Sequence, residues 1–147
     1  MSCTPAWTCE LTMLASDVLS LNGRRHRWAT ASRAKELRRL GWAEARRTGN
    51  VAPHLERARI EVFLAFSTRG RRDAHNFMPT IKPLIDGFVD AGLLPDDDSR
   101  HLEGPHLHAD MERRSERMFG RATTTFTFRV FDLGRLRDYA ATGEGAR

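Results

Sequence analysis

The chain has 147 residues, which is enough for one domain with a real hydrophobic core. Hydrophobic residues make up 40% of it, which excludes a disordered chain, and no apolar run approaches the roughly 20 residues of a membrane-spanning helix. The formal net charge is +5, and Lys35 and Lys82 are the only lysines. Because the planar guanidinium of arginine suits phosphate, a nucleic acid is a natural partner, although a coding bias towards arginine would give the same composition.

The N-terminal segment predicts a cytoplasmic protein whose chain begins with a strand. MSCTPAWTCELTML lacks the basic start and the long apolar core of a secretory signal. Cys3 and Cys9 are too few for a four-ligand zinc site, and a disulfide is improbable in a reducing compartment. Apolar and polar residues alternate over residues 6–14, which predicts a half-buried strand that contains Cys9.

A basic loop and a basic helix are expected next. Behind the turn signal Asn22-Gly23, three arginines could clamp a phosphate, or the loop could simply be solvated: Arg24, Arg25 and Arg27. Thr30 or Ser32 can cap a helix that runs to about Arg47 and ends at Gly49. Arginine dominates its exposed positions, although a charge-rich helix face is usually only a solvated one.

A central strand is predicted over residues 58–66, because it is apolar on both sides. An arginine-rich loop leaves it, and loops that leave a central strand are well placed to carry function; its arginines are Arg69, Arg71 and Arg72. A second helix should start between Asn76 and Thr80, with Thr80 as a cap that puts Pro83 in the first turn, and should end at Gly92. Lys82 and Asp86 lie four residues apart, close enough to pair.

The rest of the chain predicts two more strands. The third, over residues 100–109, is interrupted by Gly104-Pro105, which indicates an edge strand or a bulge. Residues 111–120 read as a charged connection, residues 123–131 as the fourth strand, and residues from 133 as a flexible tail with at most a short helix. The order β-α-β-α-β-β predicts one α+β domain, with a core over about 6–132, in which helices cover one face of a mixed four-stranded sheet.

Candidate metal ligands lie on both sides of the second helix. Asp73 and His75 are two residues apart, so in an extended segment their side chains point the same way. Three carboxylates, Asp96 to Asp98, follow the helix, and loops at the two helix ends could fold towards one another. A divalent cation held there would offset phosphate charge and activate water, and Lys82 could stabilise the developing charge. The alternatives are a solvated acidic turn and a helix cap.

Two other histidines, His106 and His108, share a strand face without an evident third ligand, so surface histidines are expected there. No serine or cysteine has a base partner that the sequence places beside it, so nucleophilic catalysis has little support.

The segments RRDAHN, KPLIDGFVDAG and DDDS resemble the RusA family of phage and prophage Holliday-junction resolvases. That family typically shows Asp-x-Asp-Asn, a helix of the Lys-x-x-x-Asp type and an Asp-Asp pair before a strand. LNGRRHRWATAS is also similar to the basic N-terminal loop of the family. The resemblance covers about residues 8–131, and its specific motifs lie within 71–99.

The resemblance implies a Mg²⁺-dependent homodimeric endonuclease that cuts four-way junctions or other branched DNA in recombination and repair. Two matched cuts require a two-fold pair of sites, which a dimer supplies. It implies catalytic roles for Asp73, Asp98 and Lys82, and metal ligation by Asp73, His75, Asp97 and Asp98, with Asp96 as an extra acid. It implies DNA binding by Asn76 together with Arg24, Arg25, Arg27, Arg69, Arg71 and Arg72.

The sequence departs from the family pattern at two places. His75 stands where the family usually has a second aspartate, and imidazole would favour Mn²⁺ over Mg²⁺. Residues 78–80 are extra before Lys82. Two alternatives follow: a branched-DNA-binding protein with weak or no cleavage, and a regulatory or structural partner protein whose acids only cap a turn.

Overall fold

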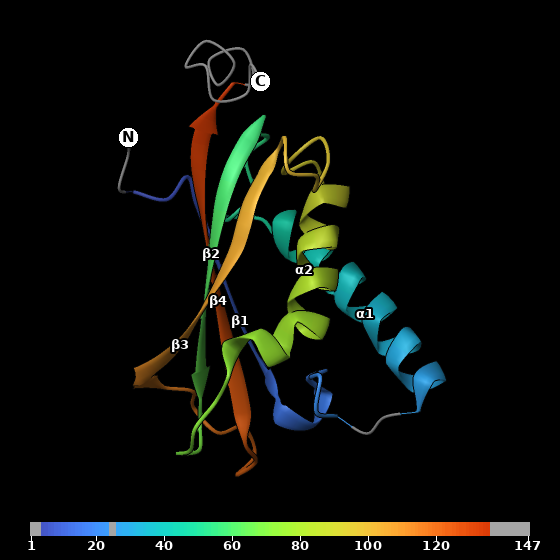
Figure 1. The fold of residues 1–147 in the computed structure, drawn as a ribbon, viewed down its shortest axis with the longest axis vertical. Coiled ribbons are helices and arrows are strands. Elements are labelled where there is room, and N and C mark those ends of the chain that lie inside the picture. The colour runs from blue at the N-terminus through green and yellow to red at the C-terminus, as the bar shows by residue number, and fades with distance from the viewer. Residues whose placement is uncertain (1–3, 24–25, 136–147) are drawn as a thin grey trace.

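The chain folds as an α+β domain with the predicted element order β-α-β-α-β-β (Figure 1). The computed structural model describes residues 4–23 and 26–135. Within these ranges it holds β1 (Trp7–Leu14), α1 (Arg27–Ala45), β2 (Arg57–Phe66), α2 (Met78–Asp90), β3 (Leu102–Arg114) and β4 (Thr123–Gly134), with 3₁₀ turns η1 (Ala15–Asp17) and η2 (Ala74–Phe77). None of the helices in the described residues is long and apolar enough to cross a membrane.

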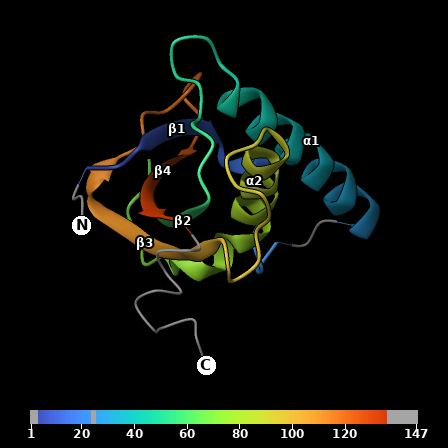
Figure 2. The ribbon, with the colours of Figure 1, turned by 90° about the horizontal axis from the view of Figure 1, so that it is seen from above.

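The sheet is mixed, as predicted, with the strand order β1-β4-β2-β3. β4 pairs antiparallel with both β1 and β2, whereas β2 and β3 are parallel. Parallel neighbours need a crossover, which α2 provides between β2 and β3. Figure 2 shows that α1 and α2 cover the same face of the sheet, so within residues 4–23 and 26–135 the other face carries no helix.

The core lies between the sheet and the two helices. The inward residues of β1 are Trp7, Cys9, Leu11 and Met13, which confirms the predicted alternation. Phe88 of α2 contacts the rings of Trp7 and Phe128 edge-on, each at a centroid distance of 5.0 Å. Burial raises the pKa of the Cys9 thiol to about 12, so this cysteine is a protonated strand residue, as expected; Cys3 lies outside the described residues.

Two glycines let α1 and α2 cross with their backbones in contact. A Cβ built on Gly41 would lie 2.2 Å from the carbonyl oxygen of Leu84, and one on Gly87 would lie 2.1 Å from that of Arg38. Real side-chain carbons do not approach that closely, so only glycine fits at both positions. At its far end α2 stops as predicted, because Gly92 has a φ of +105° and the amide of Leu93 donates to the Phe88 carbonyl at 3.0 Å.

The predicted N-terminal caps of both helices are wrong. α1 begins at Arg27 instead of after Thr30 or Ser32, because the His26 ring accepts the Trp28 amide at 3.3 Å. α2 starts at Met78, inside the predicted window, but Thr80 does not cap it. Thr80 is fully buried and its hydroxyl bonds the backbone of Leu19. Pro83 therefore lies inside the helix rather than in a first turn.

The C-terminal strands are longer than the sequence predicts. β3 is an edge strand with a register shift opposite Gly104-Pro105, as expected. It continues to Arg114, so the connection expected over 111–120 is a strand in its first part. The β2–β3 ladder resumes after a register shift, where Phe66 pairs with Arg114, and Arg113 reaches across the open face of the sheet to Glu10 and to the Thr127 hydroxyl. β4 also runs on to Gly134, so the predicted start of the tail at residue 133 is wrong. The rest of that tail, from residue 136, lies outside the described residues.

We expect Gly87→Ala to lower the free energy of unfolding by about 1–3 kcal/mol, because the added methyl overpacks the helix crossing. Helix propensity alone predicts the opposite sign, since alanine is favoured over glycine by about 1 kcal/mol. Urea denaturation measures the change. The exposed Ala43→Gly variant of α1 is the control for the propensity effect, and a Gly87→Ala protein as stable as the wild type would contradict the close crossing.

Candidate functional site

The arginine-rich loop leaves the carboxyl end of the central strand β2. Arg69 and Arg71 are exposed. Arg72 folds back instead: its guanidinium lies 5.1 Å from the ring centroid of Phe66 and donates to the Thr68 hydroxyl at 2.7 Å. Two of the three predicted phosphate contacts in this loop therefore face solvent, whereas Arg72 holds the loop against the end of β2.

The base of the N-terminal basic loop is fastened to the start of α2. The Leu21 amide donates to the Asn76 carbonyl at 2.8 Å. Thr80 accepts from the Leu19 amide and donates to the Leu19 carbonyl, both at 2.8 Å. The base of the N-terminal basic loop and the arginine-rich loop after β2, which the sequence predicts separately, thus meet at the same end of one helix. This convergence is the main feature of the site that sequence reasoning missed.

Of the other four predicted DNA contacts, the structure describes only Arg27 and Asn76. Arg24 and Arg25 lie outside the described residues. Arg27 is exposed in the first turn of α1, with its guanidinium 5.5 Å from the ring centroid of Trp28. Asn76 is half-buried in η2, where its backbone anchors the basic loop.

Asp73 and His75 form a local cap rather than a pair of aligned ligands. The Asp73 carboxylate accepts the His75 backbone amide at 3.0 Å and so caps η2. Both side chains are exposed. His75 lies within the 3₁₀ turn, so the same-side geometry expected of an extended segment does not apply to it.

Lys82 connects α2 to the acidic loop that follows it. Its ammonium group donates to Asp86 at 2.6 Å, which confirms the predicted pair, and also to Asp97. Asp96 accepts the backbone amide of Asp97 at 2.7 Å. Asp98 points to its own turn, where it accepts the amides of Arg100 and His101 at 3.1 and 3.2 Å.

The electrostatics of the Lys82–Asp97 pair favour its charged state. The hydrogen bond from Lys82 holds the pKa of the Asp97 carboxyl below its usual range. Partial burial lowers the pKa of Lys82, but the hydrogen bonds to Asp86 and Asp97 outweigh it and raise that pKa overall. Beside the cluster lies a groove of about 330 Å³, whose wall includes Arg38.

The four predicted metal ligands are not brought together. Asp73 and His75 precede α2 and the acidic loop follows it, so a 13-residue helix, about 20 Å long, separates the two segments. Figure 1 shows them at opposite ends of α2. In residues 4–23 and 26–135, no three His, Cys, Asp or Glu side chains are placed to hold a metal ion. The metal site stays a prediction from the sequence.

The two surface histidines of β3 have acidic partners on the open face of the sheet. His108 contacts Glu61 at 2.6 Å and stacks on Phe63 at a centroid distance of 4.8 Å, and His106 lies 3.7 Å from Glu103. Both are exposed, as expected. Glu61 is 47 residues from His108, so only the strand register could reveal that contact.

The sequence matches none of the known protein families against which it was scanned, and no curated protein matches it. The resemblance to junction resolvases therefore depends on the motifs within residues 71–99.

We expect Asp97→Asn to lower the free energy of unfolding by about 0.5–1 kcal/mol at pH 7, because the partly exposed pair with Lys82 is lost. The folded-state pKa of Asp97 is depressed, so its contribution is present above the ordinary carboxyl pKa near 4 and disappears as the pH falls below it. Urea denaturation from pH 7 to pH 3 should therefore show wild type and variant converging.

Asp98→Asn is the matched control, because the amide oxygen can still accept from Arg100 and His101. A difference between wild type and Asp97→Asn that persists at pH 3 would show that the variant acts through something other than this ion pair.

Proposed function

We propose that this protein is a structure-selective endodeoxyribonuclease that acts on branched DNA, such as four-way junctions, in recombination and repair. The observation that carries the proposal is that the base of the N-terminal basic loop and the arginine-rich loop after β2 meet at the start of α2, beside Asp73. The motifs within residues 71–99 supply the chemical class.

The geometry suits a DNA backbone for two reasons. The exposed Arg69 and Arg71 project from a loop anchored on the central strand, and arginine contacts phosphate through a planar fork. The Leu19–Thr80 and Leu21–Asn76 hydrogen bonds add the base of a second basic loop to the same end of the molecule. A homodimer belongs to the proposal, since symmetric resolution of a junction needs two sites related by a two-fold axis.

The residues as placed do not fit a Mg²⁺ or Mn²⁺ ion. Hard divalent cations need several oxygen ligands around one point, and Asp86 and Asp97 are both engaged by the Lys82 ammonium. Asp73 lies at the other end of α2. The cleavage part of the proposal is thus supported by the sequence resemblance, and the DNA-binding part also by the arrangement of the arginines.

A junction-binding protein without cleavage is the second candidate. It is favoured by the same separation of carboxylates and by His75, which brings no negative charge at the position of a family aspartate. The two candidates share the DNA partner and differ in whether strands are cut.

We expect junction binding to weaken at least tenfold at 50 mM salt in the Arg69→Gln/Arg71→Gln variant, because two phosphate contacts are lost. The slope of log affinity against log salt should fall by about 2, since each duplex phosphate contact contributes about 0.9. Anisotropy of a labelled four-way junction in EDTA measures both. The control Arg59→Gln/Arg129→Gln removes the same charge from the open face of the sheet, and an equal loss there would indicate only a net-charge effect.

Nicking assays on the same junction with Mg²⁺ and with Mn²⁺ separate the two candidate functions. The nuclease predicts paired nicks, with more cleavage in Mn²⁺ because of His75, and loss of at least 100-fold in Asp73→Asn and Asp98→Asn. Salt-sensitive binding without nicks in either ion would identify the non-cleaving protein. Cleavage that survives in both variants would refute the assignment of these aspartates.

A further inference from the structure

A stripe of aromatic and basic residues runs along the outer side of α1. Its members recur at spacings of four and three, which keeps them on one side of a helix: Trp28, Ser32, Lys35, Arg39, Trp42 and Arg46. The opposite side of α1 is buried through Leu37, Gly41 and Ala45. The stripe contains no acidic residue, and Asp90 of α2, which lines the pocket beside it, is paired with Arg38.

The two tryptophans of the stripe are unusually accessible. Trp28 is 69% exposed and Trp42 45%, whereas Trp7 is buried in the core. An arginine guanidinium lies over each exposed ring, Arg27 at 5.5 Å from the Trp28 centroid and Arg46 at 4.9 Å from that of Trp42. Trp28 and Trp42 are 14 positions apart, which corresponds to about 21 Å along the helix.

The two cations in the middle of the stripe, Lys35 and Arg39, differ from the neighbouring arginines of α1 because they have no carboxylate partner among the described residues. Arg33 pairs with Glu36 at 2.9 Å, Arg47 with Glu44 at 3.5 Å, and Arg38 with Asp90 at 2.6 Å. Among the described residues, Lys35 and Arg39 make no ion pair. These two positive charges are therefore available to an anionic partner.

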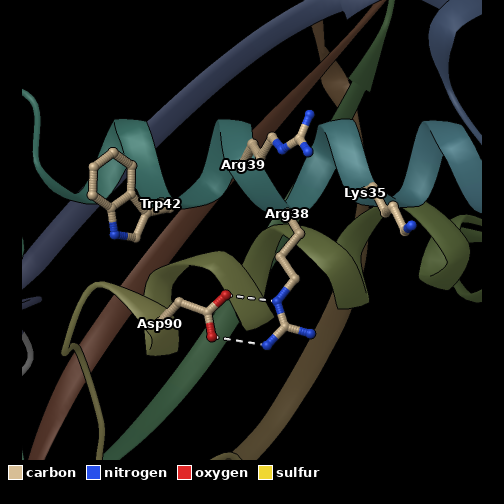
Figure 3. A pocket seen from close by; sticks show the side chains of 5 residues that line it. All are labelled: Lys35, Arg38, Arg39, Trp42 and Asp90. Atoms are coloured by element: carbon tan, nitrogen blue, oxygen red, sulfur yellow. Dashed lines mark hydrogen bonds and ion pairs between the residues drawn. The ribbon is translucent and has the colours of Figure 1, made fainter.

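Figure 3 shows how the helices separate these roles. Arg38 reaches from α1 to Asp90 of α2 with two hydrogen bonds, at 2.6 and 2.8 Å. Arg39 points away from Asp90, and Trp42 stands beside the groove of about 250 Å³ that these residues line with Lys35. The contact between the two helices thus neutralises Arg38, whereas its neighbour Arg39 faces outwards.

We propose that the outer stripe of α1 binds single-stranded DNA, with phosphates on Lys35 and Arg39 and unpaired bases stacked on Trp28 and Trp42. Charge complementarity selects a polyanion rather than an apolar partner protein, because the middle of the stripe holds two unpaired cations. Exposed indole rings select unpaired bases, since stacking needs a free base face, which a duplex buries. The stripe shares the DNA partner with the proposed junction site, and Arg27, a predicted junction contact, lies over its Trp28 ring; Lys35, Arg39 and Trp42 belong to the stripe alone.

The test uses a labelled dT₁₂ oligonucleotide in EDTA, which excludes metal-dependent binding. We expect salt-sensitive binding to the wild type, at least tenfold tighter than to a 12-base-pair duplex. Lys35→Gln/Arg39→Gln should bind at least tenfold more weakly, with the salt slope reduced by about 1.4, because each single-strand phosphate contact contributes about 0.7. Arg59→Gln/Arg129→Gln, on the open sheet face, should bind as the wild type does.

Tryptophan fluorescence reports the stacking directly. Oligonucleotide binding should quench the wild-type emission, and quenching should largely disappear in Trp28→Phe/Trp42→Phe, in which only the buried Trp7 emits. Trp42→Ala should weaken binding about tenfold, with unchanged circular dichroism because the ring is on the surface.

Two outcomes would overturn the proposal: equal affinity for the duplex and for dT₁₂, or unaltered affinity in the Lys35/Arg39 variant. Arg69→Gln/Arg71→Gln should keep its affinity for dT₁₂ while it loses the junction. A failure of the junction function can therefore be told apart from a failure of the stripe.

Discussion

The close crossing of α1 and α2 is the contact on which the rest of the structure depends. Gly41 and Gly87 remove the side chains that would hold the two backbones apart, so both helices can lie on one face of a four-stranded sheet. The same approach brings Arg38 within reach of Asp90. It also fixes the rotation of α1, which turns Leu37 towards the core and Trp28 and Trp42 towards solvent.

A second set of contacts holds the base of the N-terminal basic loop at the start of α2. Thr80 is a polar residue buried in α2, and both hydrogen bonds of its hydroxyl go to the backbone of Leu19. A buried hydroxyl is costly without such partners, so the segment before α1 is held against the start of α2. The arginine-rich loop after β2 reaches the same place through the chain itself, because it leads into η2. Proximity of the two basic segments is thus a consequence of packing rather than of charge.

Positive and negative charges are distributed unequally over the described surface. The carboxylates of α2 and its following loop are engaged by Lys82 and Arg38 or by backbone amides, so the acidic loop presents less free negative charge than DDDS suggests. The exposed arginines after β2 and the cations on the outer side of α1 have no such neutralisation. In the two proposals above, a branched DNA with single-stranded arms contacts the first surface through duplex phosphates and the second through unpaired bases.

Local patterns predicted the elements well, because the information lies within a few residues. The alternation over residues 6–14 places Cys9 inwards, the spacing of Lys82 and Asp86 predicts their pair, and Gly92 ends α2. The wrong predictions occur where a contact with a residue far away in the sequence overrides the local sequence pattern. Thr80 is a residue type that often caps helices, but its hydroxyl bonds the backbone of Leu19, 61 residues away. β3 extends past its predicted end because Arg114 pairs with Phe66 of β2 across a register shift.

The candidate site shows the same contrast between what local sequence patterns predict and what long-range contacts decide. The sequence by itself determined which residue types are available: arginines before and after the second strand, carboxylates on both sides of α2, and two tryptophans on one side of α1. Only the tertiary structure decided which of them meet. Asp97 joins Lys82 rather than Asp73, since a straight helix of about 20 Å stands between the two acidic segments, and the basic loop joins the start of α2, since a buried hydroxyl must find a partner there.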